Sequence, residues 1–117
     1  MISPVVSFER ALNQVEAWYR LDNAGRVRQF LYQHPMLPGV LVEAFGPLQK
    51  CFGPYPQVML RVVADPEVED SDELFAYIRT SLPPEDALNR LNELDELWFL
   101  DQLDRVNGLF NFNLEFE

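Results

Sequence analysis

The sequence contains only one cysteine, Cys51, and one histidine, His34, among its 117 residues. A single cysteine cannot form an internal disulfide, and an ordinary zinc site takes its ligands from several cysteine and histidine side chains. We therefore expect no disulfide and no metal site. So little cysteine is compatible with a reducing compartment, and we expect a cytoplasmic protein.

Glycine is also scarce, and long apolar runs are missing. The five glycines form no loop of the kind that cradles a phosphate, and no serine lies in a G-x-S-x-G motif. No apolar run approaches the roughly 20 residues that a helix needs to cross a bilayer, and the start of the sequence does not resemble a signal peptide. The sequence therefore predicts no cofactor, no membrane span and no serine nucleophile of that class.

Basic residues are few in the second half of the chain, where the acidic residues concentrate. Residues 1–56 hold five Lys or Arg and four Asp or Glu, a net charge of +1, whereas residues 57–117 hold four and fifteen, a net charge of −11. Nucleic-acid binding depends largely on cationic contacts to phosphate, so we expect no nucleic-acid partner. An acidic half is compatible with a basic protein partner, or serves only to keep the surface soluble.

Apolar residues make up 48% of the chain, which predicts one folded domain over residues 1–117. Residues 1–56 read as a helical half, in which apolar residues recur at helical spacing. Residues 57–117 read as a half of strands with one helix. That helix is expected to begin within the stretch Ser81 to Asp86, because prolines and acids suit a first turn. Its predicted buried stripe is Ala87, Leu88, Leu91, Leu94 and Trp98.

The clearest local signal is a β-hairpin with strands near residues 57–64 and 73–80. The stretch from Asp65 to Glu73 that links them carries six acids, which repel one another and favour water. Residues near 109–116 alternate strictly between apolar and polar, which predicts a third strand. We expect an α+β fold in which N-terminal helices precede β-β-α-β. The predicted sheet is antiparallel and three-stranded, in the order 2-1-3, with Ala64 opposite Leu74, and it packs on the helices.

Five stretches from Phe30 onward resemble a group of small, uncharacterised cyanobacterial proteins. They are FLYQHPML, LVEAFGPLQKCFG, VVADPE, ELFAYIRTSLPPEDALNRLNELDELWFLD and the closing NLEFE. Together they cover about half of the chain. The resemblance implies a soluble bacterial protein. The group has no established activity, so the resemblance assigns no functional residue.

The two faces of the predicted hairpin differ in polarity. One face is wholly apolar and is expected in the core, while the other mixes apolar, aromatic and arginine side chains in the manner of a protein interface. We call this second set the candidate interaction face; its residues are Met59, Arg61, Val63, Phe75, Tyr77 and Arg79. We expect it to be covered either by the first helix, with Trp18 and Tyr19, or by another chain. The sequence thus favours a non-catalytic module that binds a protein partner or forms a homodimer.

The alternative is a small hydrolase or lyase that uses carboxylates near the Trp98 helix. The candidate carboxylates are Glu93, Asp95, Glu96, Asp101 and Asp104. Two carboxylates in a cleft can act as acid and base, but an enzyme needs a concave pocket that gathers at least two titratable groups. We interpret Cys51 as a small buried residue and His34, which precedes a proline, as a residue at a helix end.

Overall fold

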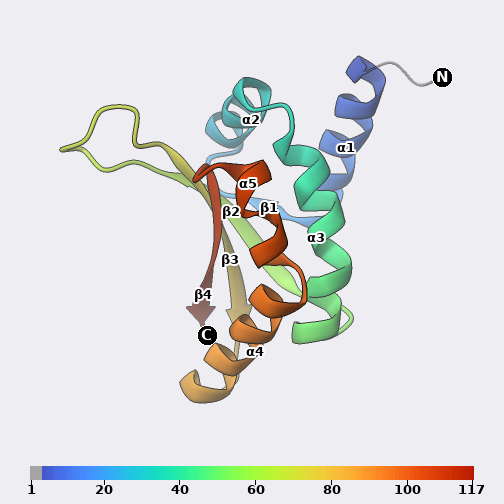
Figure 1. Cartoon of the computed structure of the whole chain (residues 1–117), viewed down its shortest axis with the longest axis vertical. Helices are drawn as coiled ribbons and strands as arrows, with labels where there is room; N and C mark the ends of the chain where they lie inside the picture. Colours follow the sequence, from blue (N-terminus) through green and yellow to red (C-terminus); the bar gives the residue numbers. More distant parts are fainter. Residues whose placement is uncertain (1–3) are drawn as a thin grey trace.

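A computed structural model describes residues 4–117, and it describes side chains from Ser7 onward. Helices pack on one face of a four-stranded sheet (Figure 1). The elements in chain order are α1 (Pro4–Trp18), β1 (Arg20–Leu21), α2 (Ala24–Gln33), α3 (Leu37–Phe52), β2 (Gln57–Val63), β3 (Glu73–Thr80), α4 (Pro84–Leu97), the 3-10 helix η1 (Phe99–Gln102), α5 (Leu103–Val106) and β4 (Phe110–Phe116). Within the described residues, none of the helices is long and apolar enough to cross a membrane.

The α+β class is confirmed, and the three expected strands lie within a residue of their predicted ends. The predicted antiparallel order 2-1-3 is wrong. The sheet has the order β1-β2-β3-β4, in which only β2 and β3 are antiparallel, while β4 lies parallel to β3 and β1 parallel to β2. After β3, the chain returns along α4, so β4 starts again at the end where β3 began. A crossover of this kind produces a parallel pair.

The predicted pairing of Ala64 with Leu74 is also wrong, by two residues. Val62 lies opposite Leu74, and the strand ends at Val63. There the hydroxyl of Ser71 accepts a hydrogen bond from the Asp65 N–H, at 2.8 Å, and donates one to the Asp65 carbonyl, at 3.0 Å. These bonds close the loop before Ala64 can join the ladder. A slip of two residues leaves every side chain on its expected face.

The core lies between the sheet and the helices. A single cluster of buried residues joins side chains of α1, α2, α3 and α4 to the inner faces of β2, β3 and β4. Phe112 on β4 is buried, and its ring centroid lies 5.0 Å from that of Phe99 in η1. The expected burial of Leu88 is wrong, because that side chain is 52% exposed. α4 stops at Leu97, and the following 3-10 turn brings Phe99 into the core.

The N-terminal helices pack on the inner side of the sheet. The buried Tyr19 hydroxyl donates a hydrogen bond to the Leu41 carbonyl of α3 at 2.6 Å, and the Trp18 ring lies 4.8 Å from that of Phe45. These contacts hold the end of α1 against α3. Of the two alternatives for covering the candidate interaction face, the first helix is therefore excluded. Below, the side of the sheet away from the helices is called the open face.

Candidate interaction site on the open sheet face

The structure brings all six residues of the candidate interaction face together on the open face. Met59 lies opposite Tyr77, and Arg61 lies opposite Phe75. Met59, Phe75 and Tyr77 are half-buried, whereas the other three are exposed, Val63 at 36%. Apolar side chains therefore form the middle of a surface that the helices do not cover.

β1 and the residue after it add two side chains that the sequence did not predict here, Arg20 and Asp22. Arg20 pairs with Met59 in the sheet, and the Asp22 N–H donates to the Leu60 carbonyl at 2.9 Å. Arg61 Nε in turn donates to Asp22 Oδ2 at 2.7 Å. A two-residue strand between helices has no periodicity, so the sequence held no signal for it. Its polar residues extend the open face beyond the hairpin.

Arg61 contacts Tyr77, which in turn packs on Phe75. The guanidinium carbon of Arg61 lies 5.2 Å from the centroid of the Tyr77 ring, and the Tyr77 and Phe75 centroids are 5.9 Å apart. A cation over an aromatic face is attracted by the ring quadrupole. The hydrogen bond to Asp22, more than any other contact, raises the pKa of Arg61. Arg61 therefore keeps its charge and a fixed position on the face.

The far side of the open face is polar and belongs to β4. Asn111 and Asn113 bend back, and each side-chain oxygen accepts the N–H of the next residue, Phe112 or Leu114, at 2.8 Å. In the parallel ladder these two N–H groups point away from β3, toward the free edge of the sheet. The two asparagines thus satisfy the donors of the edge strand, and Glu115 is left as the charged side chain that projects from β4.

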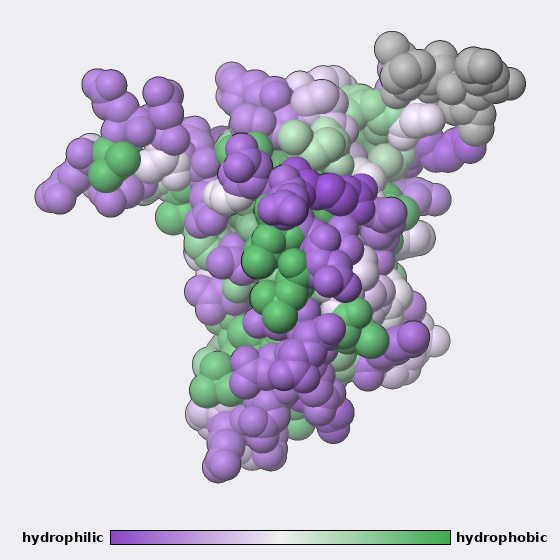
Figure 2. All heavy atoms as spheres, viewed as in Figure 1, coloured by the Kyte–Doolittle hydropathy of each residue, from purple (hydrophilic) through white to green (hydrophobic). Residues whose placement is uncertain are grey.

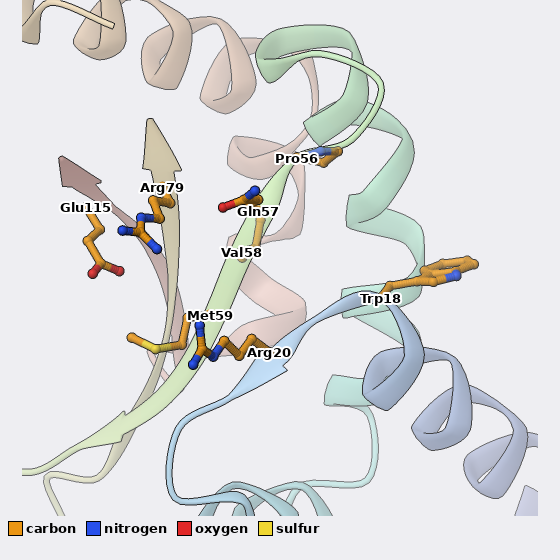
Figure 3. Close-up of a pocket in the computed structure, with 8 residues that line it drawn as sticks. All are labelled: Trp18, Arg20, Pro56, Gln57, Val58, Met59, Arg79 and Glu115. Atoms are coloured by element: carbon orange, nitrogen blue, oxygen red, sulfur yellow. The ribbon is translucent and has the colours of Figure 1, made fainter. Parts of the chain in front are cut away.

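One end of the open face is hollowed (Figure 3). The hollow has a volume of about 420 Å³, and its lining includes Arg20, Gln57, Met59, Arg79 and Glu115. These five side chains project to the same side of the sheet, whereas Trp18 points away from them. Arg79 also forms an ion pair with Glu117, with a nitrogen–oxygen distance of 3.4 Å. The rest of the lining is apolar and consists of Trp18, Pro56 and Val58, so the hollow combines charged, polar and apolar groups.

Two charged side chains of the open face form no ion pair in the described part of the chain, because Arg79, which lies opposite Glu115 in the sheet, pairs with Glu117. Among residues 4–117, neither Arg20 nor Glu115 forms an ion pair, although Arg61 and Arg79 each do. Arg20 lies on β1 and Glu115 on β4, at opposite edges of the sheet. The open face therefore presents an unpaired cation at one edge and an unpaired anion at the other.

The carboxylates proposed for the enzyme alternative are only partly brought together. Glu93 and Glu96 line a second hollow, of about 400 Å³, with Lys50, Cys51 and Leu97. Asp95, Asp101 and Asp104 do not line it. Burial, with the nearby Glu93 carboxylate, raises the pKa of the Cys51 thiol, which therefore stays protonated at neutral pH and is a weak nucleophile.

His34 and the acidic loop fit structural roles. The His34 ring packs on Phe30, with centroids 4.5 Å apart, and its backbone N–H donates to the Phe30 carbonyl at the end of α2. In the acidic loop, Asp65 accepts the Glu67 N–H, and Asp72 pairs with Arg26. Within the described part of the chain, no group of three or more His, Cys, Asp or Glu side chains is arranged to hold a metal ion.

Comparison with protein-family models, with curated proteins and with solved structures found no match to this chain. The resemblance to small cyanobacterial proteins stays a prediction. Function is therefore inferred from the open face itself.

Proposed function

We propose that this protein is a non-catalytic interaction module that binds a protein partner through the open face. The observation that carries the proposal is the uncovered apolar middle of that face, formed by Met59, Val63, Phe75 and Tyr77. Covering apolar area is favourable by about 25 cal/mol per Å². Aromatic residues and arginine at the centre of a patch, with polar residues around it, are typical of protein interfaces.

The chemistry of the face favours binding over catalysis. Its side chains include no serine, cysteine or histidine. Arg61 and Arg79 are each neutralised by a carboxylate of the same chain. A face without a nucleophile, whose central charges are already paired, suits a partner surface better than a reacting substrate.

The hydrolase or lyase alternative is supported by one observation, the hollow that holds Glu93 and Glu96. The other three candidate carboxylates lie outside it, and the Cys51 thiol beside it is protonated. A hydrolase at this place would use Glu93 and Glu96 as its acid and base, so Glu93→Gln and Glu96→Gln would each lose any hydrolytic activity that the wild type shows.

The proposal is tested with Tyr77→Asp, which places a charge in the middle of the open face. The matched control is Tyr55→Asp, because Tyr55 is 90% exposed and lies outside the open face. The tagged proteins are sized by sedimentation, both purified and in extract of the cells that carry the gene. We expect the wild type and Tyr55→Asp to sediment as a complex larger than 13.6 kDa, and Tyr77→Asp to sediment as a monomer. A wild type that is monomeric in both samples would contradict the proposal.

A further inference from the structure

We infer that the partner on the open face is a second copy of this chain, stacked sheet to sheet about a two-fold axis parallel to the strands. The inference rests on the proposed function and names the partner for the same surface. A two-fold axis makes the interface self-complementary, so each contact occurs twice. With the strand order β1-β2-β3-β4, this rotation places β1 over β4 of the second copy, and β2 over β3.

The unpaired charges of the open face match under this rotation. Arg20 at the β1 edge comes over the β4 edge of the second copy, which carries Glu115. Across the sheet, Arg20 is aligned with Met59, Tyr77 and Asn113. Glu115 lies two residues beyond Asn113 on β4, so Arg20 and Glu115 of the second copy are offset by two residues along the strand direction. An arginine side chain spans that offset. Each rim of the dimer therefore gains one ion pair from two charges that form none among the described residues of their own chain.

The apolar middle of the face meets itself in the same arrangement. Met59 of one copy lies over Tyr77 of the second copy. Val63 and Phe75 lie on the same two strands, β2 and β3, and face the second copy as well. Arg61 enters this region with its charge already paired to Asp22 and its guanidinium over an aromatic ring. Burying it does not leave an unpaired charge, which is the costly case. The centre of the face is therefore compatible with burial against a second copy.

The open face is large enough for a weak, transient interface. Three strands of about seven residues and the two-residue β1, at about 4.8 Å between strands and 3.3 Å per residue, make a face of roughly 360 Å². Two such faces stacked together bury roughly 700 Å² in total, which is below the size of stable interfaces and suits a transient contact. The predicted dimer is therefore at the weak end of the range, and it dissociates on dilution.

The free edges of the sheet are poorer places for self-association. On β4, the outward N–H groups of Phe112 and Leu114 are already taken by the asparagine side chains. β1, at the other edge, is only two residues long. Occupied donors and very short edge strands are common protections against strand-to-strand pairing. The structure thus points to the face of the sheet and away from its edges.

The helical side is less suitable for a second copy as well. Its exposed apolar surface is broken into separate areas by hydrophilic surface (Figure 2). Leu97, Leu100 and Leu103 are about half exposed there, and they alternate with Glu96, Asp101 and Asp104. A two-fold contact would bring these acids against their own copies, and like charges repel.

A charge exchange tests the inference on the purified full-length protein. The variants are Arg20→Glu, Glu115→Arg and the double variant, and dissociation constants are measured by sedimentation equilibrium from micromolar to millimolar concentration. Each single change puts like charges together at both rims, so we expect dimerisation to weaken roughly tenfold. The double variant restores opposite charges and is expected to return to within a few-fold of the wild type. Arg90→Glu, the same charge change on the exposed side of α4, is the control and should leave the dissociation constant unchanged.

A monomeric wild type at millimolar concentration would overturn the inference. The proposed function would survive that result if the extract still showed a complex that depends on Tyr77. If the wild type dimerises but Arg20→Glu leaves the dissociation constant unchanged, the stacked geometry is overturned. The same holds if the double variant does not restore the wild-type dissociation constant. Restoration by the double variant supports it, since a merely structural defect in either single variant would not be repaired by the second change.

Discussion

Arg61 and Tyr77 form a cation–π pair across β2 and β3, with the guanidinium carbon 5.2 Å from the ring centroid. The contact is diagonal, because Arg61 lies directly opposite Phe75. Asp22 holds the arginine from the other side. The pair fixes the side chains at the centre of the open face before any partner binds, so less side-chain entropy is lost on association.

The Arg61 contacts predict a modest loss of stability in Arg61→Gln. The change removes an ion pair between half-exposed side chains and a cation–π contact at an exposed site. Together these are expected to lower the free energy of unfolding by about 1 kcal/mol in urea denaturation at low protein concentration. Arg28→Gln, which removes only an ion pair with Glu16 on the helical side, should cost less. Equal losses in the two variants would contradict a contribution from Tyr77.

Phe112→Ala is expected to lower the free energy of unfolding by about 3–5 kcal/mol, because it leaves a cavity beside Phe99 and Trp98. The matched control on the same strand is Phe116→Ala, whose side chain is 49% exposed and should cost much less. Thermal or urea unfolding of both variants measures the difference. If Phe116→Ala cost as much as Phe112→Ala, the burial assigned along β4 would be incorrect.

Because the Tyr19 hydroxyl is buried, we expect the free energy of unfolding to fall in alkali. Burial raises the pKa of this hydroxyl above the ordinary value of about 10. The folded state then binds a proton that the unfolded state releases, so the free energy of unfolding is constant below the ordinary pKa and falls as pH rises above it. Tyr19→Phe should show a shallower fall in alkali. At neutral pH it should cost about 1 kcal/mol, because the Leu41 carbonyl loses its donor. Parallel pH profiles for the two proteins would refute this role.

The β4 edge predicts aggregation when its asparagine caps are removed. In Asn111→Val and Asn113→Val, the outward N–H groups of Phe112 and Leu114 lose their acceptors, and a β-branched residue favours strand pairing. Light scattering at high protein concentration should rise faster in the double variant than in wild type. Asn89→Val on the exposed side of α4 is the control. Equal scattering in the two variants would show that the asparagines do not protect the edge.

The sequence predicted the hairpin well because alternation in β2 and β3 reports directly which side chains face the core. Val58, Leu60, Leu74 and Ile78 are all buried, and the six residues of the candidate interaction face share the opposite side. Strand order was not predictable in this way. Alternation says which face of β4 is buried, but it does not say which neighbour the strand pairs with. That depends on the path of α4 over the sheet, which is a tertiary property.

The edges of the site could not be predicted either. Arg20 belongs to a two-residue strand that forms only because β2 offers it a partner, and Asp22 follows that strand. The role of Phe99 likewise depends on where α4 ends, and DELWFLDQLD gives no strong stop signal. The sequence therefore identified the centre of the candidate site and missed the cation that, in our account, meets Glu115 of a second copy.

Oxidative footprinting of the two methionines Met59 and Met36 tests the central claim most directly. Met59 lies at the middle of the open face, and Met36, which is 45% exposed before α3, serves as the internal control in the same molecule. The ratio of their oxidation rates is measured in dilute purified protein, in concentrated purified protein and in native cell extract. We expect oxidation of Met59 to slow relative to Met36 in the concentrated sample, and in extract, because a second chain covers the open face. The same ratio in all three samples would contradict the account.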